Sequence, residues 1–147
     1  MLTNDSGKIE VFRTTMMNQI AMTNSDRIIK KLLIVDDSKV SRMVIRARIL
    51  DIHPEWQIIE AASGNEAIEL VDKDTPDFCT MDINMPGTIG TDAAEQILAK
   101  HPSMRIVIFS ANIQESFQNR ASSIGAIFVA KPVTEKSIAE AIAHFVG

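Results

Sequence analysis

The chain has 147 residues, a length typical of one domain, and 46% of its residues are hydrophobic, which is enough to fill a core without disulfides or structural metals. Its single cysteine excludes an intramolecular disulfide and suits a reducing compartment. A formal net charge of −4, with no basic block longer than Lys30–Lys31, argues against direct nucleic-acid binding.

The sequence contains no apolar run long enough to span a membrane and no signal-peptide pattern, so we expect a cytoplasmic protein without membrane insertion. Residues 1–29 lack sustained apolar periodicity and are expected to form an N-terminal extension, flexible or weakly helical. This extension is either a dispensable tail, which we favour on general grounds about termini, or a regulatory segment. A domain at residues 30–147 is expected to follow it.

The domain begins with residues 31–35, a continuous apolar run that predicts a strand buried on both faces. Residues 38–50 then show the spacing of an amphipathic helix. Its apolar residues that fall on one face are Val40, Val44, Ala47 and Leu50. Residues 56–61 predict a second strand, and the capping-box spacing of Ser63 and Glu66 predicts a helix that reaches about Val71.

The rest of the chain continues the same alternation. The further predicted elements are strand 77–81, helix 91–100, strand 105–110, helix 114–124, strand 126–130 and helix 134–145. Gly125 is a typical helix-ending residue, and Thr134 is expected to cap the last helix. Strict alternation of strands and helices predicts a parallel sheet with right-handed crossovers and helices on both faces.

Polar residues follow four of the predicted strands. They are Asp36 and Asp37 after the first strand, Asp82 after the third, Ser110 at the end of the fourth and Lys131 after the fifth. In open α/β sheets, ligands bind beyond the carboxyl ends of the strands. We therefore expect three carboxylates, a hydroxyl and an ammonium group to meet at one edge of the sheet.

Three neighbouring carboxylates repel one another, and a divalent cation relieves that repulsion. Mg²⁺ fits best because it takes oxygen ligands and is commonly bound by one or two carboxylates plus a phosphate, whereas no His/Cys cluster favours zinc. An Asp carboxylate can attack phosphorus and form an aspartyl phosphate. Mg²⁺, Lys131 and Ser110 would then each neutralise or hydrogen-bond one phosphoryl oxygen.

At these residues the sequence resembles the receiver domain of two-component response regulators, over residues 30–147. The stretches that carry the resemblance are LLIVDDS (32–38), MDINMPGTIG (81–90), IVIFSA (106–111) and FVAKP (128–132). The resemblance implies a flavodoxin-like, doubly wound α/β fold with five helices and a five-stranded parallel sheet in the order 2-1-3-4-5.

The resemblance also implies roles for individual residues. Asp82 would be the phosphoacceptor, and Mg²⁺ would be held by Asp36, Asp37, Asp82 and the backbone carbonyl of Asn84, with Asp37 a direct ligand. Ser110 and Lys131 would contact the phosphoryl group. Among the flanking positions, Ala111 would leave the acceptor accessible, Pro132 would follow a cis peptide bond, and Phe128 would be an aromatic switch residue that signals by burial and exposure.

Each of these residues has a simpler explanation when taken alone. Asp36 and Asp37 could cap the following helix, and Asp82 could be a turn residue. Ser110 could be a satisfied hydroxyl, Phe128 a core residue and Lys131 a solvated surface charge, while Cys79 is best interpreted as a small core residue. Their joint placement at successive strand ends favours the functional interpretation.

We therefore expect a phosphorylation-activated switch, in which a sensor histidine kinase or a histidine phosphotransfer protein phosphorylates Asp82. The protein would not be an enzyme acting on external substrates, but it would catalyse its own phosphotransfer and slow self-dephosphorylation. The alternative is a degenerate receiver that acts as a constitutive protein-interaction module. An aspartyl phosphatase of another α/β family is disfavoured. Such families carry an Asp-x-Asp pattern after the first strand, whereas the two aspartates of this chain are adjacent.

Two interaction surfaces are expected. The exposed part of residues 38–50, including Val40 and Met43, is predicted to dock the phosphodonor. By resemblance, residues 114–145 would form the output face, and since the sequence ends with the last predicted helix, we expect a separate downstream protein to receive the signal.

Overall fold

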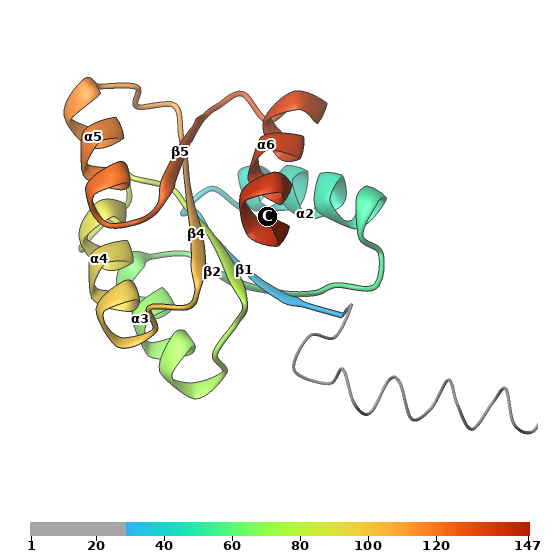
Figure 1. The fold of residues 1–147 in the computed structure, drawn as a ribbon, viewed down its shortest axis with the longest axis horizontal. Helices are drawn as coiled ribbons and strands as arrows, with labels where there is room; N and C mark the ends of the chain where they lie inside the picture. The colour runs from blue at the N-terminus through green and yellow to red at the C-terminus, as the bar shows by residue number, and fades with distance from the viewer. Residues whose placement is uncertain (1–28) are drawn as a thin grey trace, which may run out of the picture.

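The structure is a computed structural model that describes residues 29–147, in which five strands alternate with five helices (Figure 1). The strands are β1 (Lys31–Val35), β2 (Gln57–Ala61), β3 (Phe78–Met81), β4 (Arg105–Ser110) and β5 (Ile127–Ala130). The helices are α2 (Lys39–Ile52), α3 (Gly64–Lys73), α4 (Gly90–Lys100), α5 (Glu115–Ser123) and α6 (Glu135–Val146). The extension predicted for residues 1–29 lies outside the described residues except for Ile29.

The five strands form one parallel sheet in the order β2-β1-β3-β4-β5. The chain leaves β1 toward β2 on one side and then crosses back to β3 on the other, so the strand order reverses next to β1. This confirms the predicted doubly wound α/β fold. The switch point lies between the carboxyl ends of β1 and β3, where ligands bind in folds of this type.

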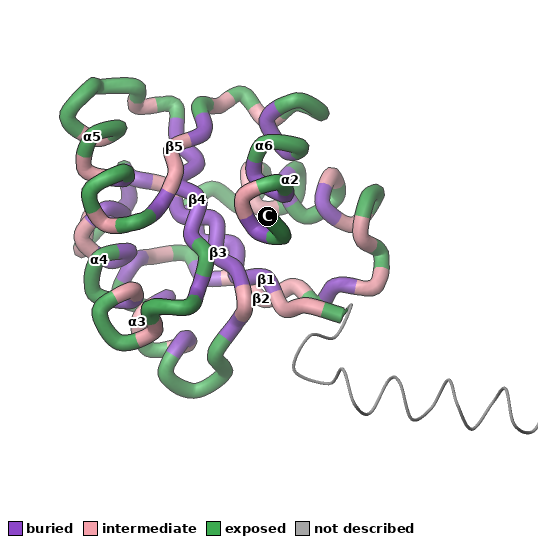
Figure 2. Tube along the Cα trace, viewed as in Figure 1, coloured by how far each residue is buried: buried purple, intermediate pink, exposed green. Residues whose placement is uncertain are grey.

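Helices cover both faces of the sheet, with α2 and α6 on one side and α3, α4 and α5 on the other (Figure 1). Successive residues of β1 supply the two cores in turn, because neighbouring strand residues point to opposite faces. Leu32 and Ile34 pack under α2 and α6, whereas Leu33 and Val35 pack under α3 to α5. The central strands β1, β3 and β4 are accordingly buried almost throughout, whereas the edge strands β2 and β5 are partly exposed (Figure 2).

Helix α2 buries a different face from the one that the sequence suggested. Its buried residues are Ile45 and Ile49, while Val40, Val44 and Ala47 are exposed. The helix therefore has two apolar stripes. The β-branched pair at 45 and 49 packs against the sheet, and the stripe that contains Val40 points away from it.

Helix ends follow the predicted signals closely. The Ser63 hydroxyl accepts a hydrogen bond from the Glu66 backbone at 3.1 Å, and Thr134 caps α6 in the same way. Gly125, which follows α5, has a φ of +86°, in the left-handed region where glycine is favoured. No helix among residues 29–147 is both long and apolar enough to cross a membrane.

Aromatic side chains join the amino-terminal ends of the strands to α6. The His53 ring stacks on Trp56 with a centroid separation of 4.1 Å, and Trp56 in turn lies 5.1 Å from Phe78. Phe78 at the start of β3 stacks on Phe145 of α6 at 4.8 Å. This row of rings closes the core under α2 and α6 at the end of the sheet opposite the switch point.

Candidate functional site

Three carboxylates meet at the switch point, as the alternation of strands and helices predicts. Asp36 and Asp37 follow β1, and Asp82 follows β3, and one carboxylate oxygen from each residue lies within 4.8 Å of the others. The adjacency is fixed by the sheet, because the backbone N–H of Asp82 donates to the carbonyl of Val35 at 2.9 Å. The two strands thus bring residues that are distant in the sequence to one place.

Asp36 is the buried member of the group, with only 2% of its surface exposed. Its Oδ1 accepts from the backbone N–H of Ser38 at 2.9 Å, and its Oδ2 accepts from the Lys131 ammonium at 2.7 Å. Ser38 rather than either aspartate is the N-cap of α2. The capping explanation therefore does not account for Asp36 and Asp37, and the Asp37 side chain is left exposed beside the other two carboxylates.

Asp82 has one oxygen held by its own loop and one oriented toward a cation. Oδ1 accepts from the Ile83 backbone N–H at 2.8 Å, and Oδ2 lies 3.7 Å from the Lys131 Nζ. Burial raises the pKa of Asp82, the Lys131 ammonium opposes that rise, and the Asp36 carboxylate adds to it. Asp82 is thus partly a turn residue, as its sequence context suggests, and partly a desolvated carboxylate in a crowded anionic site.

Ser110 and Lys131 reach the site from the ends of β4 and β5. The Lys131 backbone N–H donates to the Ser110 carbonyl at 2.9 Å, which extends the ladder by one residue beyond β5. The Ser110 hydroxyl is buried, accepts from the Asn112 backbone N–H at 3.1 Å, and by its proximity lowers the Asp82 pKa slightly. Both residues therefore lie beside the Asp82 carboxylate.

The remaining predicted residues surround this group. Phe128 is half-buried and packs against the core under α3 to α5, and Ala111 is exposed next to Ser110. The peptide bond between Lys131 and Pro132 is cis, as the resemblance implies. Asn84 is exposed at the rim, where its side-chain oxygen accepts from Asn112 at 3.4 Å; its backbone carbonyl as a metal ligand stays a prediction.

Sequence reasoning missed two residues that shape the site. At Gly90 an added Cβ would lie 1.7 Å from the backbone oxygen of Asp82, so only glycine lets α4 approach the loop this closely. Arg42 donates from Nη1 to the Asp36 carbonyl at 2.7 Å. Both contacts span only six to eight residues, but each depends on the path of the loop between a strand and the next helix, which the residue pattern does not specify.

The donor set fits Mg²⁺. It consists of oxygen ligands alone, and within residues 29–147 it is the one group of three or more acidic, histidine or cysteine side chains close enough to share an ion. Three carboxylates beside one ammonium leave two negative charges unmatched when all are ionised, which a divalent cation balances.

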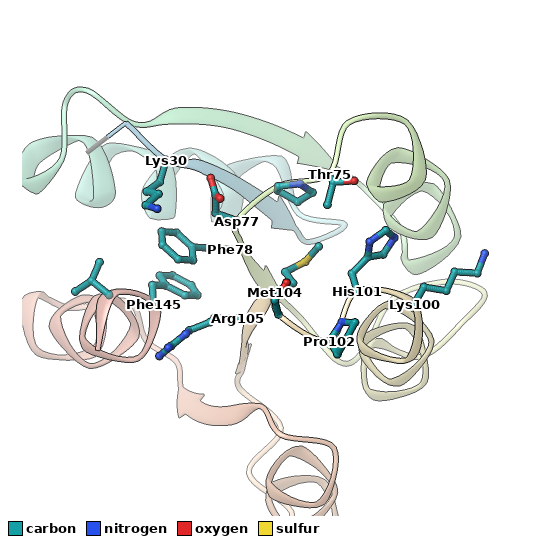
Figure 3. A pocket seen from close by; sticks show the side chains of 13 residues that line it. Lys30, Thr75, Asp77, Phe78, Lys100, His101, Pro102, Met104, Arg105 and Phe145 are labelled. Atoms are coloured by element: carbon teal, nitrogen blue, oxygen red, sulfur yellow. The ribbon is translucent and has the colours of Figure 1, made fainter. Parts of the chain in front are cut away.

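A hollow of about 760 Å³ lies at the opposite end of the sheet (Figure 3). It is lined by the starts of β3 and β4, the end of α4 and the end of α6. Several of its charged groups have partners: Lys100 and His101 pair with Asp72, and Arg105 donates to the backbone carbonyl of His144 at 3.0 Å. This hollow holds none of the predicted site residues.

Comparisons with known proteins agree on one family. Residues 32–143 match the family model of the response regulator receiver domain. The chain is similar to the chemotaxis protein CheY of Listeria monocytogenes, with 38% identity over 114 residues that cover 76% of this chain and 94% of that protein. It is also similar to the transcriptional regulatory protein DegU of Brevibacillus brevis, with 30% identity, but spans only 48% of that protein.

Solved structures give the same result. A LuxR-family two-component response regulator from an Aurantimonas species superposes with a TM-score of 0.72 and 30% identity, over 81% of this chain and 86% of that one.

Proposed function

Because this chain belongs to the response regulator receiver domains of two-component signalling systems, we propose that Asp82 is its phosphoacceptor. Phosphorylation of an aspartate is general in the family, and Asp82 is the carboxylate at the end of the central strand β3 that also faces a lysine. The observation that carries the proposal is the convergence of Asp36, Asp37, Asp82 and Lys131 at the switch point.

In the proposed reaction an oxygen of Asp82 attacks the phosphorus of a phosphohistidine on the donor protein. The new P–O bond forms as the P–N bond breaks, and the histidine of the donor is the leaving group. Lys131, whose ammonium is 3.7 Å from Asp82, would bind a phosphoryl oxygen, and the Ser110 hydroxyl would donate to another. Slow hydrolysis of the aspartyl phosphate at the rim formed by Asn84 and Asn112 would return the protein to its resting state.

A Mg²⁺ ion bound by Asp37, Asp82 and the carbonyl of Asn84 would supply charge neutralisation for the phosphoryl oxygens. Asp36 would act mainly through Lys131 and Ser38, because both of its oxygens already accept hydrogen bonds. Asp37 is exposed and offers its carboxylate directly. This difference supports Asp37 as a direct ligand.

Phosphorylation adds about two negative charges and new acceptor oxygens next to Ser110. Movement of Ser110 toward the phosphate would open space for Phe128, which is only half-buried in the resting structure. A shift of Phe128 inward would change the face formed by α5, β5 and α6, which a downstream partner protein would then bind.

The outward stripe of α2 supports a docking site for the phosphodonor, either a sensor histidine kinase or a histidine phosphotransfer protein. Val40 and Met43 are 69% and 57% exposed, and they follow directly on the loop that carries Asp36 and Asp37. Large exposed apolar side chains grouped on one helix mark protein contacts more often than isolated ones. Glutamate at both positions should slow transfer from a donor protein and leave labelling by acetyl phosphate unchanged.

The deciding experiment is labelling of the full chain with acetyl phosphate in the presence and absence of MgCl₂, followed by mass determination of the intact protein. We expect one phosphoryl group on the wild type with Mg²⁺ and none on Asp82→Asn. The matched control is Asp77→Asn, which alters a carboxylate at the opposite end of the sheet and should be labelled like the wild type. Full labelling of Asp82→Asn would contradict the site assignment, and an unlabelled wild type would favour the constitutive interaction module.

A further inference from the structure

Arg42 of α2 joins three parts of the fold beside the proposed metal site. Its Nη1 donates to the backbone carbonyl of Asp36 at 2.7 Å, and its Nε donates to Glu60 Oε1 on β2 at 2.9 Å. The Arg42 side chain is only 16% exposed, and both hydrogen bonds are partly buried. We infer that Arg42 is a positioning residue for the metal site, which orients the Asp37 carboxylate by fixing the peptide plane between Asp36 and Asp37.

The Asp36 carbonyl lies between two elements. β1 ends at Val35, and the first backbone acceptor of α2 is the Ser38 carbonyl, which receives the Arg42 backbone N–H at 3.0 Å. The Asp36 carbonyl therefore belongs to neither element, although Asp36 itself is buried. A buried carbonyl without a partner is costly, and Arg42 removes that cost.

The same hydrogen bond determines where Asp37 points. The peptide unit is planar, so a fixed Asp36 carbonyl also fixes the Asp37 nitrogen and Cα. Asp36 has independent anchors through Ser38 and Lys131, whereas the Asp37 side chain is exposed. The direction of the Asp37 carboxylate therefore depends on the orientation of this peptide plane more strongly than the direction of the Asp36 carboxylate does.

The ion pair with Glu60 allows the positively charged Arg42 to lie next to the proposed metal site. An unpaired guanidinium this close to Asp36 and Asp37 would oppose a divalent cation, but the ion pair with Glu60 offsets its charge. The planar guanidinium of arginine can donate to two acceptors in fixed directions at once. The ammonium of a lysine is less suited to this. Glu60 in turn is placed by the sheet, because it pairs in register with Ile34 of β1.

Arg46 provides a matched control in the same helix. It pairs with the second oxygen of Glu60 at 3.1 Å, yet its side chain is 45% exposed and its hydrogen-bond partner among the described residues is Glu60 alone, not Asp36. Loss of Arg46 therefore removes a cation and an ion pair to Glu60 without touching the Asp36–Asp37 peptide.

This inference rests on the proposed function, and the test measures metal binding rather than activity. The full chain, as wild type, Arg42→Met, Arg42→Lys and Arg46→Met, would be titrated with MgCl₂ and followed by the backbone amide resonances, which also report whether each variant is folded. Outer hydrogen-bond partners of metal ligands are commonly worth 10- to 100-fold in affinity, so we expect Arg42→Met to weaken Mg²⁺ binding by about tenfold. Arg42→Lys should bind with intermediate affinity, and Arg46→Met should match the wild type.

The outcomes separate this inference from the proposed function. If the wild type does not bind Mg²⁺, the proposed metal site and the role of Arg42 are both wrong. If the wild type binds and the folded Arg42→Met binds equally well, only the role of Arg42 is wrong. Should Arg42→Met not fold, Arg42→Lys decides, because wild-type affinity in that variant would also overturn the inference.

Discussion

At the amino end of the sheet Asp72 pairs with both Lys100 and His101, whereas at the carboxyl end three carboxylates lie together and the ammonium of Lys131 pairs with two of them, Asp36 and Asp82. The hollow of about 760 Å³ lies at the amino end, where Lys100 and His101 have an acidic partner. The carboxyl end has the excess of negative charge and a carboxylate with a raised pKa. In this protein an excess of negative charge, rather than the size of a hollow, marks the proposed site.

The largest expected difference between the two ends is in the rate of phosphorylation. Lys131→Met removes the cation that contacts both Asp36 and Asp82, and loss of one such electrostatic partner commonly costs about 100-fold in rate. Lys100→Met, which removes a lysine at the amino end, should leave the rate unchanged. Time courses of acetyl phosphate labelling measure both rates. Equal rates for the two variants would show that Lys131 has no special role in phosphorylation.

A smaller difference is expected in stability with metal. At a Mg²⁺ concentration ten times Kd, binding to the folded state alone adds about 1.4 kcal/mol and raises the Tm by several degrees. Asp37→Asn should lose most of this gain, whereas Asp74→Asn at the amino end should keep it. Thermal unfolding with and without MgCl₂ tests this, and a gain that persists in Asp37→Asn would show that the ion binds elsewhere.

Two threonines allow the effect on stability of a buried hydroxyl without a hydrogen-bond partner to be compared with that of one that has a partner. The Thr80 hydroxyl, buried two residues before Asp82, has no hydrogen-bond partner among the described residues, whereas the Thr75 hydroxyl near the amino end donates to the Val71 carbonyl at 3.0 Å. Thr80→Val should stabilise the protein by up to about 1 kcal/mol, because the valine needs no partner. Thr75→Val should destabilise it. Denaturant unfolding of both variants checks the signs, and destabilisation by Thr80→Val would mean that the hydroxyl has a partner.

The smallest effect concerns His144 of α6 at the amino end. Burial lowers the pKa of His144, and the Arg105 guanidinium lowers it further. The unfolded chain takes up this proton at the ordinary histidine pKa of about 6.5, and the folded chain only at lower pH, so stability should fall as the pH decreases through that range. His144→Gln should flatten this part of the pH–stability curve. The same slope in both proteins between about pH 7 and pH 5 would contradict the assignment.

Much of the fold could be predicted because its signals are local. The run Leu32–Val35 is buried, as its apolar sequence predicts for a strand covered on both faces, and alternation with helices then brings the strand ends to one edge. For that reason Asp36, Asp82, Ser110 and Lys131 could be grouped from the sequence alone. The fifth strand and last helix followed from equally local signals at Gly125 and Thr134.

The parts that could not be predicted depend on contacts between elements. Helix α2 has two apolar stripes, and only the path of the β1–α2 loop decides that Ile45 and Ile49 face the sheet while Val40 faces outward. The contact of Arg42 with Asp36 and the close approach of Gly90 to Asp82 arise in the same way. Periodicity can reveal that a helix has an apolar stripe, but it cannot assign that stripe to the core or to a partner.

The row of aromatic rings at the amino end also determines what optical spectroscopy can detect. Trp56, the only tryptophan of the chain, is stacked on His53 and packed near Phe78 at the end of the sheet away from Asp82. Its fluorescence should follow unfolding of the core under α2 and α6, but it should change little when a cation or a phosphoryl group binds at the switch point. A fluorescent reporter of phosphorylation would therefore have to be introduced, and the exposed position Ile113, next to Asn112, is a suitable place for it.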